Sequence, residues 1–445
     1  MQATFATACI AGAAAALLLP CASRSETLAQ AVESSIAWNP EVRAALSSWR
    51  AVAQTVTQAR AQFLPSIDAN LARGRERTDS PITRPLGPPP TLSRSEAGIT
   101  VSQLLFDGGA ASSELRRQEA RAEAAYAQFG ATAETVAGRT AQVFFEVLRL
   151  RALVALAEQN LAVHQNTLKQ MVRRSDSGIG RRSDDRQTAA RVALAQSTLA
   201  QLRGLLKQAE AGYRNQTGQA ADALAGEATP VASLPSTAQA AVDLALATHP
   251  AIRAAKLEVE ASVADRNFAQ SRYAPRATLE LGATHNRDLD GLRGLNGDRT
   301  AMLVLRHNLF RGGADAARVR EAEARRDQAG DLVARAQNDL ERDVRQAWEG
   351  LESERVRLPD LQRYAEASAE VVEAYRSQFT LGQRSLLDVL NAENELYNAR
   401  SGHVNGDIGV ATGAYRVLAA MGRMLEQLGI RLPDAIQGES RMAPK

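Results

Sequence analysis

The stretch from Val143 to Met171, VFFEVLRLRALVALAEQNLAVHQNTLKQM, decides the architecture of this chain. Mostly apolar residues recur in it at alternating steps of four and three. They are Val143, Val147, Leu150, Val154, Ala157, Leu161, His164, Leu168 and Met171. This spacing keeps them on one side of a helix and predicts a coiled-coil seam. A second seam with the same spacing runs from Leu340 to Phe379, so two long helices are expected.

The two seams belong to an internal repeat. Pro40 and Pro65 are each matched by a proline 210 residues later (250−40 and 275−65). The hexapeptide LFDGGA, which begins at Leu105, returns as LFRGGA at Leu309, 204 residues later (309−105). Matches at a nearly constant offset indicate one structural unit that is present twice, with small insertions in its loops.

The composition argues against several classes of function. The 445 residues include 53 basic and 50 acidic side chains, a net charge of +3, and no basic run that would bind nucleic acid. The five histidines show no metal-ligand spacing, and His164 is interpreted as a polar register position on its seam. No nucleophile elbow or paired acid–base constellation appears. We therefore expect no enzyme, no metal site and no cofactor.

The first 23 residues form a short, alanine-rich apolar segment that is typical of a secretory signal peptide. Two outcomes are considered, cleavage after Ser23 and lipidation at Cys21, and cleavage is favoured because Pro20 fits a lipoprotein cleavage box poorly. Both cysteines, Cys9 and Cys21, lie in this segment, so the exported chain would carry no disulfide. Nothing later reaches the roughly 18 consecutive apolar residues of a transmembrane helix. A membrane would therefore have to be crossed by strands.

Helix and strand alternate within each repeat. A capping residue precedes both Pro40 and Pro250, which predicts that a helix begins at each of these prolines. After Pro65 and Pro275 the period of the apolar residues changes to two, which predicts strands. Four strands of about ten residues result, and this length crosses a bilayer when the strand is tilted. Their expected ranges are about 66–74, 97–106, 276–286 and 299–310.

Long helices are expected to follow the second strand of each repeat, from Ala110 and Ala314, and shorter helices to return from about Ser183 and Ser385. The predicted fold is therefore mainly α with a transmembrane β section, built from a duplicated helix–strand–strand–helix unit. The predicted division of the chain is a signal peptide at 1–23, a first repeat at 24–214, a linker at 215–235, a second repeat at 236–424 and a C-terminal extension at 425–445.

Four amphipathic strands cannot stand alone in lipid. The two edges of such a sheet would leave backbone N–H and C=O groups without partners, at several kcal/mol for each group. The chain is therefore expected to form an oligomer. Two copies would supply eight strands, as in the smallest known barrels, and three copies would supply twelve strands around a wider lumen.

The ordered set of features resembles the TolC family of outer-membrane efflux proteins. The set comprises the duplicated unit, the two LFxGGA blocks and the segment Gly382–Ala399, GQRSLLDVLNAENELYNA. The resemblance implies a homotrimer whose shared twelve-stranded outer-membrane β-barrel is continued by a long α-helical coiled-coil tunnel. The barrel would lie in the outer membrane of a Gram-negative bacterium, with the helical part in the periplasm. The linker and the C-terminal segment would form an equatorial region.

The resemblance also implies a role in export. Family members dock to a periplasmic adaptor protein and an inner-membrane pump, here an ABC or RND-type transporter, and so form a tripartite machine. The sequence around Asp388 most resembles that of the family branch that serves type I protein secretion. A duct for small molecules, drugs or metal ions is one alternative. A periplasmic coiled-coil scaffold without a pore is another.

A gate is the most specific feature that the resemblance implies. Asp388 matches the first position of a carboxylate ring that narrows the periplasmic entrance and binds cations, and Arg384 matches an arginine that holds the entrance shut. Asn391 stands where the family has the second ring carboxylate, and Phe379 stands where it has a linking tyrosine. Asp388 also completes a helix-capping box with Ser385, and one carboxylate can serve both purposes.

The first helix pair is expected to carry an equivalent constriction. The resemblance places Asp184, Asp185 and Arg186 there, although the family often has an aspartate at the position of Arg186. Glycines interrupt both helix pairs next to these residues, and the turns they form would face the adaptor or simply end the helices. These glycines are Gly178, Gly180 and Gly382.

Overall fold

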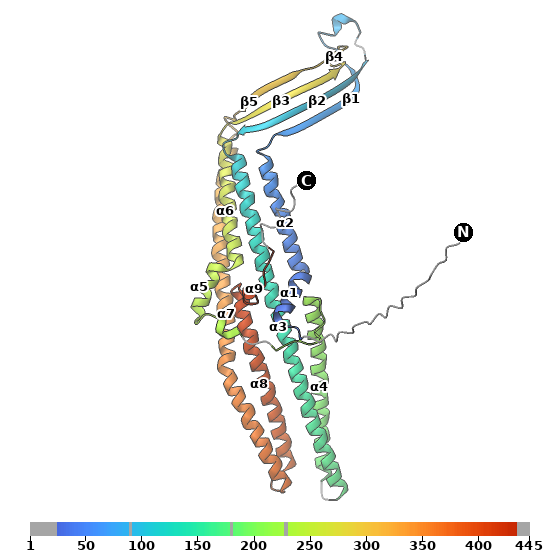
Figure 1. The fold of residues 1–445 in the computed structure, drawn as a ribbon, viewed down its shortest axis with the longest axis vertical. Helices are drawn as coiled ribbons and strands as arrows, with labels where there is room; N and C mark the ends of the chain where they lie inside the picture. The colour runs from blue at the N-terminus through green and yellow to red at the C-terminus, as the bar shows by residue number, and fades with distance from the viewer. Residues whose placement is uncertain (1–24, 89–90, 179–180, 227–229, 434–445) are drawn as a thin grey trace, which may run out of the picture.

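Helices make up most of the described chain, and the strands gather at one end of it (Figure 1). The structure is a computed structural model that describes residues 25–88, 91–178, 181–226 and 230–433. The signal peptide expected at 1–23 lies outside these residues. Most of the C-terminal extension also lies outside them.

Each repeat runs helix, helix, strand, strand, long helix and returning helix. The helices of the first repeat are α1 (Leu28–Trp38), α2 (Pro40–Ala61), α3 (Ala110–Asp176) and α4 (Arg182–Thr217). Those of the second are α5 (Ala238–Thr248), α6 (Pro250–Gln270), α7 (Ala314–Thr380) and α8 (Leu386–Ala420), followed by α9 (Met424–Gln427). The strands are β1 (Ser66–Arg77), β2 (Thr91–Phe106), β3 (Arg276–Arg287), β4 (Leu295–Asn296) and β5 (Arg299–Arg306). Short 3-10 helices lie at Arg84–Leu86, Pro230–Ser233 and Ser271–Tyr273.

The two long helices are equal in length. α3 and α7 each have 67 residues, which corresponds to a rod of about 100 Å. α7 continues through Pro359 without interruption. In Figure 1, α4 runs back along the lower half of α3, and α8 runs back along the lower half of α7, so two helical hairpins form the end far from the sheet. Among the described helices, none is both long enough and apolar enough to cross a membrane.

A double glycine joins the sheet to each long helix. Gly108 and Gly109 have φ of +67° and +88°, a region that favours glycine over other residues. A Cβ on Gly108 would lie 2.2 Å from the Cβ of Ala274, so no other residue fits this elbow. Asp107 then accepts the N–H groups of Gly109 and Ala111 at 3.1 and 2.8 Å and thereby caps the start of α3.

The four long strands form one antiparallel sheet in the order β1-β2-β3-β5, and the short β4 pairs with the far end of β3. Residues opposite each other in this register point to the same face. One face is apolar and exposed. It carries Ile67, Ala69, Leu71, Ile99, Val101, Leu279, Leu281, Ala283, Ala301, Leu303 and Leu305. The other face is polar. It carries Ser66, Asp68, Asn70, Glu96, Thr100, Ser102, Thr278, Glu280, Thr284 and Thr300.

The strands differ from their expected ranges at three places. β1 continues to Arg77 rather than ending near residue 74. β2 begins at Thr91 rather than near residue 97, because Thr91 pairs with Arg77 and the hairpin continues into what was expected to be a polar loop. β5 ends at Arg306 rather than near residue 310, because its partner β3 begins opposite it at Arg276, the residue after Pro275. The first hairpin is therefore longer than expected, and the second repeat contributes a shorter last strand.

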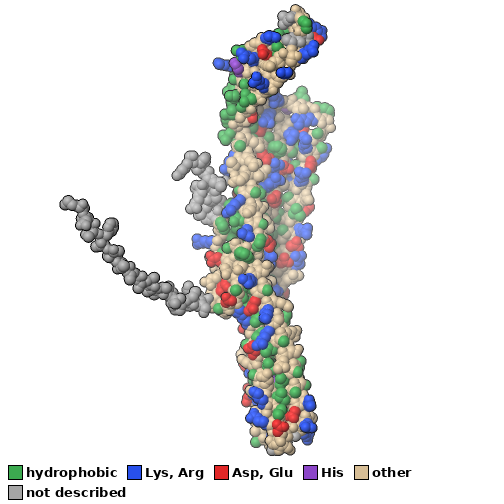
Figure 2. All heavy atoms as spheres, turned by 90° about the vertical axis from the view of Figure 1, so that its right-hand side faces the viewer, with side chains coloured by type: hydrophobic (Ala, Val, Ile, Leu, Met, Phe, Trp, Pro, Cys, Tyr) green, Lys and Arg blue, Asp and Glu red, His purple; other side chains and the backbone are tan. Residues whose placement is uncertain are grey.

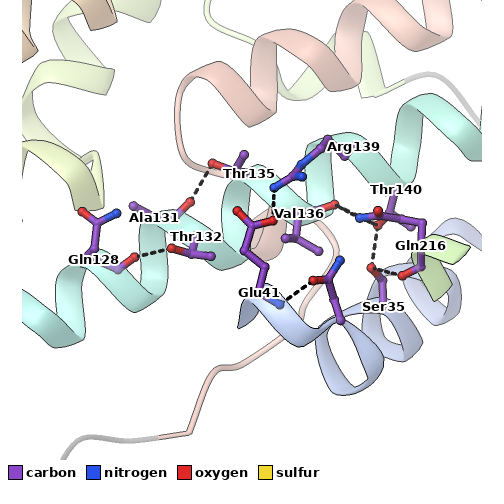
Figure 3. A network of polar contacts seen from close by, with 11 residues as sticks. Ser35, Glu41, Gln128, Ala131, Thr132, Thr135, Val136, Arg139, Thr140 and Gln216 are labelled. Atoms are coloured by element: carbon purple, nitrogen blue, oxygen red, sulfur yellow. Dashed lines mark hydrogen bonds and ion pairs between the residues drawn. The ribbon is translucent and has the colours of Figure 1, made fainter. Parts of the chain in front are cut away.

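A polar network, buried on one side and exposed on the other, joins four helices near the middle of the rod (Figure 3). The Thr140 hydroxyl of α3 donates to the Ser35 hydroxyl of α1 at 2.9 Å, and the Ser35 hydroxyl donates to the Gln216 carbonyl of α4 at 3.0 Å. On the exposed side, Arg139 of α3 donates to Glu41 of α2 at 2.6 Å. These bonds fix where the short helices α1 and α2 sit along α3. The surrounding core is mostly alanine, valine and leucine.

The C-terminal segment docks onto the same region through a buried carboxylate. Glu134 of α3 is 6% exposed and accepts the N–H groups of Met424 and Leu425 at 2.9 and 3.3 Å. It therefore caps the N-terminus of α9, where a negative charge is favourable. Burial nevertheless raises the pKa of Glu134 from 4.5 to about 7, and the nearby charge of Glu426 also raises it.

We expect the docking of α9 to depend on pH. Because the pKa of Glu134 is higher in the folded protein than in the unfolded chain, this carboxyl stabilises the dock fully below pH about 4.5, and the contribution is lost as pH rises through about 7. The change is at most about 3 kcal/mol. Amide hydrogen exchange of Met424 and Leu425, corrected for intrinsic rates, should show it. Glu134→Gln should remove the dependence. Glu146 on the same helix, whose half-exposed carboxyl pairs with Arg149, is the control, and Glu146→Gln should preserve the dependence.

Candidate functional site

The candidate site is the pair of hairpin tips at the end of the rod far from the sheet (Figure 1). One tip joins α3 to α4 and contains Gly178, whose φ is +76°. The other joins α7 to α8 and contains Gly382, whose φ is +78°. A Cβ at either glycine would meet nothing within 4 Å, so both turns project freely. Gly180 lies outside the described residues.

Asp388 lies in the first turn of α8. Its N–H donates to the Ser385 hydroxyl at 3.2 Å, and that hydroxyl donates to the Asp388 carboxylate at 2.8 Å. One half of the expected capping box, the bond from the Asp388 N–H to Ser385, is therefore present, while the carboxylate binds the Ser385 hydroxyl. The Asp388 side chain remains 42% exposed, and the Arg384 guanidinium approaches it to 3.9 Å. The carboxylate thus accepts a hydrogen bond from the capping hydroxyl and still presents charge to solvent.

Arg384 is held against the end of α7. Its guanidinium lies 4.0 Å from the centre of the Tyr375 ring, a cation–π contact. Its Nε donates to the Gln378 side chain at 3.1 Å. Arg384 therefore joins the last turns of α7 to the first turn of α8. Tyr375 was visible in the sequence only as a seam residue, and its role beneath Arg384 was not foreseen.

Phe379 joins the two hairpins. It packs beside a small buried cluster made of Met171 from α3 with Leu386 and Leu390 from α8. The guanidinium of Arg174, on α3, lies 5.3 Å from the centre of its ring. The position where the family has a linking tyrosine is thus occupied by an apolar and cation–π contact.

Asn391 makes a direct bond between the hairpins. Its side-chain oxygen accepts a hydrogen bond from Arg191 of α4 at 2.9 Å. Arg191 was not identified from the sequence. The positive charge of Arg191 also acts on His164 of α3, a side chain that is only 2% exposed. Burial lowers the pKa of His164, and the charge of Arg191 lowers it further, so this imidazole is neutral at physiological pH.

The acidic residues of the first tip lie at the N-terminus of α4. Asp184 and Asp185 stand in the first helical turn, where the helix dipole favours negative charge. Asp184 accepts from the Ser183 hydroxyl at 3.2 Å, whereas Oδ1 of Asp185 is buried and has no hydrogen-bond partner among the described residues. Arg186 is exposed. The structure therefore places carboxylates at the first turns of both returning helices.

The arrangement suits a charged constriction better than a metal centre or a catalytic site. Among the described residues, no group of three His, Cys, Asp or Glu side chains is placed to hold a metal ion. The carboxylates are instead arranged singly or in pairs at helix starts. Arginine–aromatic contacts and the Arg191–Asn391 bond connect the helices that carry them.

Known proteins match this chain over most of its length. The family model for outer membrane efflux proteins matches residues 31–219 and 241–423, which are the two repeats. The chain is 28% identical to the outer membrane efflux protein BepC of Brucella suis over 92% of this chain and 89% of BepC. It is 26% identical to the alkaline protease secretion protein AprF of Pseudomonas aeruginosa over 81% and 77%. The solved structure of the outer membrane protein VceC of Vibrio cholerae superposes with a TM-score of 0.76 at 17% identity, over 89% and 96%.

The bond between Arg191 and Asn391 should set the separation of the tips. Arg191→Ala removes that bond, so the hairpins are expected to move apart. Both natural cysteines lie in the first 23 residues, so spin labels can be placed on the exposed positions Arg182 and Gln383 through introduced cysteines. Pulsed electron paramagnetic resonance should then show label-to-label distances shifted to longer values.

A matched control removes an arginine that acts inside one hairpin only. Arg203 of α4 donates to Glu158 of α3 at 2.6 Å, and both side chains are about half exposed. Arg203→Ala should leave the distance distribution as in the parent protein. If Arg191→Ala also leaves it unchanged, the bond to Asn391 does not hold the tips together.

Proposed function

Because this chain belongs to the outer membrane efflux protein family, we propose that it is the outer-membrane duct of a type I protein secretion machine. The general function, without the cargo, follows from membership of this family. The protein is an outer membrane efflux channel component of a Gram-negative bacterium, with its helical tunnel in the periplasm. It is a transport component and not an enzyme, as expected from the sequence. The alternative of a scaffold without a pore is thereby excluded.

The proposed assembly is a homotrimer with a twelve-stranded barrel. Two features of the sheet support it. Among the described residues, β1 pairs only with β2 and β5 pairs only with β3, so both edges are open to another copy. The apolar face is exposed, with Leu71 at 85% and Leu303 at 69%, as an outward face in lipid requires. Three copies of the four long strands would close the sheet, and TolC-family channels form trimers.

Protein cargo is supported chiefly by the residues that follow the second tip. The segment Gly382–Ala399 is most similar to the type I secretion branch of the family. The name of one relative, the alkaline protease secretion protein AprF, describes protein secretion. Small-molecule, drug or metal efflux is the second candidate, because the relative with 28% identity, BepC, is named an efflux protein.

The proposed partners are a periplasmic adaptor protein and an inner-membrane transporter, of the ABC type if the cargo is protein and of the RND type in the efflux alternative. The hairpin tips are the proposed adaptor contact, through the turns that contain Gly178, Gly180 and Gly382. The open space around Gly178 and Gly382 supports this, because an approaching protein would meet bare backbone there. The adaptor would then contact the same helix ends that carry the proposed gate.

The proposed gate combines a charged ring with ties between hairpins. In a trimer, three Asp388 carboxylates would surround the pore and would repel each other or hold a cation between them. Arg384 offsets part of this charge, because in each chain its guanidinium lies 3.9 Å from the Asp388 carboxylate. Asp184, Asp185 and Arg186 would contribute from the neighbouring helix start. Phe379 and Asn391 act as hinge contacts rather than ring members, because they bind Arg174 and Arg191 within one chain.

Asp388 variants separate the ring from the helix cap. We expect Asp388→Ala to raise the concentration of a multivalent cation that blocks the channel in planar bilayers about tenfold or more, because three charges leave the pore. Asp388→Asn removes the charge and keeps an oxygen that can accept from Ser385. If only the cap matters, Asp388→Asn should behave as the parent protein. If the ring binds cations, it should behave as Asp388→Ala.

A deletion strain tests the cargo. We expect the culture medium of the deletion strain to lack one or a few large secreted proteins, while its drug and metal tolerance stays at the parental level. Quantitative proteomics of the medium and growth inhibition series measure the two properties side by side. Normal secretion together with increased drug or metal sensitivity would overturn protein cargo in favour of efflux.

A further inference from the structure

Four of the five arginines on the apolar face of the sheet form a cluster at the end far from the helices, and the fifth, Arg299, lies opposite Ala283. Arg73, Arg75 and Arg77 alternate along β1, and Arg287 ends β3. Arg73 and Arg287 both lie opposite Ser95 of β2, so they flank it in one row across three strands. The two arginine backbones are therefore two strand spacings apart, about 10 Å. We call these four residues the arginine belt.

The register places the belt on the side of the sheet that faces lipid. Arg73 continues the row of Ile67, Ala69 and Leu71 along β1, two residues at a time. Arg287 likewise follows Leu281 and its apolar neighbours along β3. Successive residues at this spacing share one face. The outward face thus changes from apolar to basic along β1 and β3, whereas β2 continues with Ser95, Ser93 and Thr91.

The change occurs at the height where a membrane ends. On the apolar face of β2, the residues from Ala97 to Phe106 span about 30 Å along the strand, or about 23 Å across the membrane at a tilt of about 40°. The usual apolar band is about 25 Å tall. Ser95 and the arginines beside it therefore stand just beyond this band. Because the helices leave the sheet at its other end, the belt lies on the cell exterior (Figure 1).

The belt arginines have no ion-pair or hydrogen-bond partner among the described residues of their own chain. All four are exposed, and none forms an ion pair or side-chain hydrogen bond within the part of the chain that the structure describes. Arg94 on the polar face differs from them because it forms ion pairs, with Glu76 at 3.0 Å and with Glu96 at 2.5 Å. The apolar face carries no acidic residue in any of the four long strands. Figure 2 shows basic side chains around this end of the sheet.

Unpaired cations so close together on one face call for an anion. The like charges of the belt repel each other, and an anion between them would remove this repulsion. Guanidinium groups bind phosphate through two parallel hydrogen bonds, and long arginine side chains reach from an apolar surface to a polar headgroup layer. The residue between Arg73 and Arg287 is Ser95, which has only a small, uncharged side chain.

We propose that the arginine belt binds the phosphate groups of a phosphorylated glycolipid in the outer leaflet of the outer membrane. The site would fix the height of the sheet in the bilayer and surround the outer rim of the channel with bound lipid. The proposal rests on the location of the protein in the outer membrane and does not depend on its cargo.

The test is a titration of the purified, full-length channel with lipid A that carries two phosphates, followed by native mass spectrometry. We expect Arg73→Gln combined with Arg287→Gln to weaken binding about tenfold or more, because charge-assisted bonds to phosphate are lost. Arg73→Lys with Arg287→Lys should weaken it less, since the charge stays and the paired bonds do not. Lipid A without phosphates should bind the parent protein as weakly as it binds the glutamine variant.

The control removes two arginines from the polar face at the other end of the sheet. Arg276 and Arg306 lie opposite each other there, and Arg276→Gln with Arg306→Gln should bind lipid A as the parent does. Normal single-channel conductance of the belt variant would show that it folds and assembles, and so separates this proposal from the channel function.

Three results would overturn the proposal. The first is equal binding of lipid A by the parent protein and by the glutamine variant at Arg73 and Arg287. The second is equal binding of lipid A with and without its phosphates. The third is displacement of lipid A by inorganic phosphate at equal concentration, which would mean that the belt binds any phosphate and does not select a lipid.

Discussion

The open edges of the sheet are the constraint on which the rest of this molecule depends. Among the described residues β1 and β5 each have a strand partner on one side only, and in lipid every unpaired backbone group costs several kcal/mol. In the proposed trimer, neighbouring copies supply the missing partners. Each strand that enters the closed sheet is joined through a short connection to a helix of the rod, so closing the sheet also gathers the helices into a ring. The helical wall of the tunnel is therefore a consequence of closing the sheet.

Most of the fold was accessible from the sequence because its signals are local. The caps at Asn39 and His249, each followed by a proline, are present as expected. The long helices were visible from their seams. The far ends of β1 and β2 were not, because residues 72–77 and 91–96 are largely polar or charged and resemble a loop. Only the pairing of the two strands shows that this stretch is a hairpin, and only the register shows which arginines face outward.

In the candidate site, too, the local bonds could be predicted from the sequence and the bonds between the hairpins could not. The bonds between Ser385 and Asp388 span three residues and could be predicted from the capping pattern. The bond between Arg191 and Asn391 joins residues 200 positions apart, and it exists because α4 and α8 come together at the tips. The cation–π contact of Arg174 with Phe379 also requires both hairpins. A single sequence contains the residues of such contacts but no signal that pairs them.

The equal length of α3 and α7 has a consequence for the mouth of the channel. Both helices start after a double glycine at the sheet and have 67 residues, so the two tips of one chain end at nearly the same level. Three copies would then present six similar hairpin ends in one plane, an approximate sixfold surface on a threefold assembly. A docking protein could meet that rim with either three or six subunits, without a mismatch of symmetry.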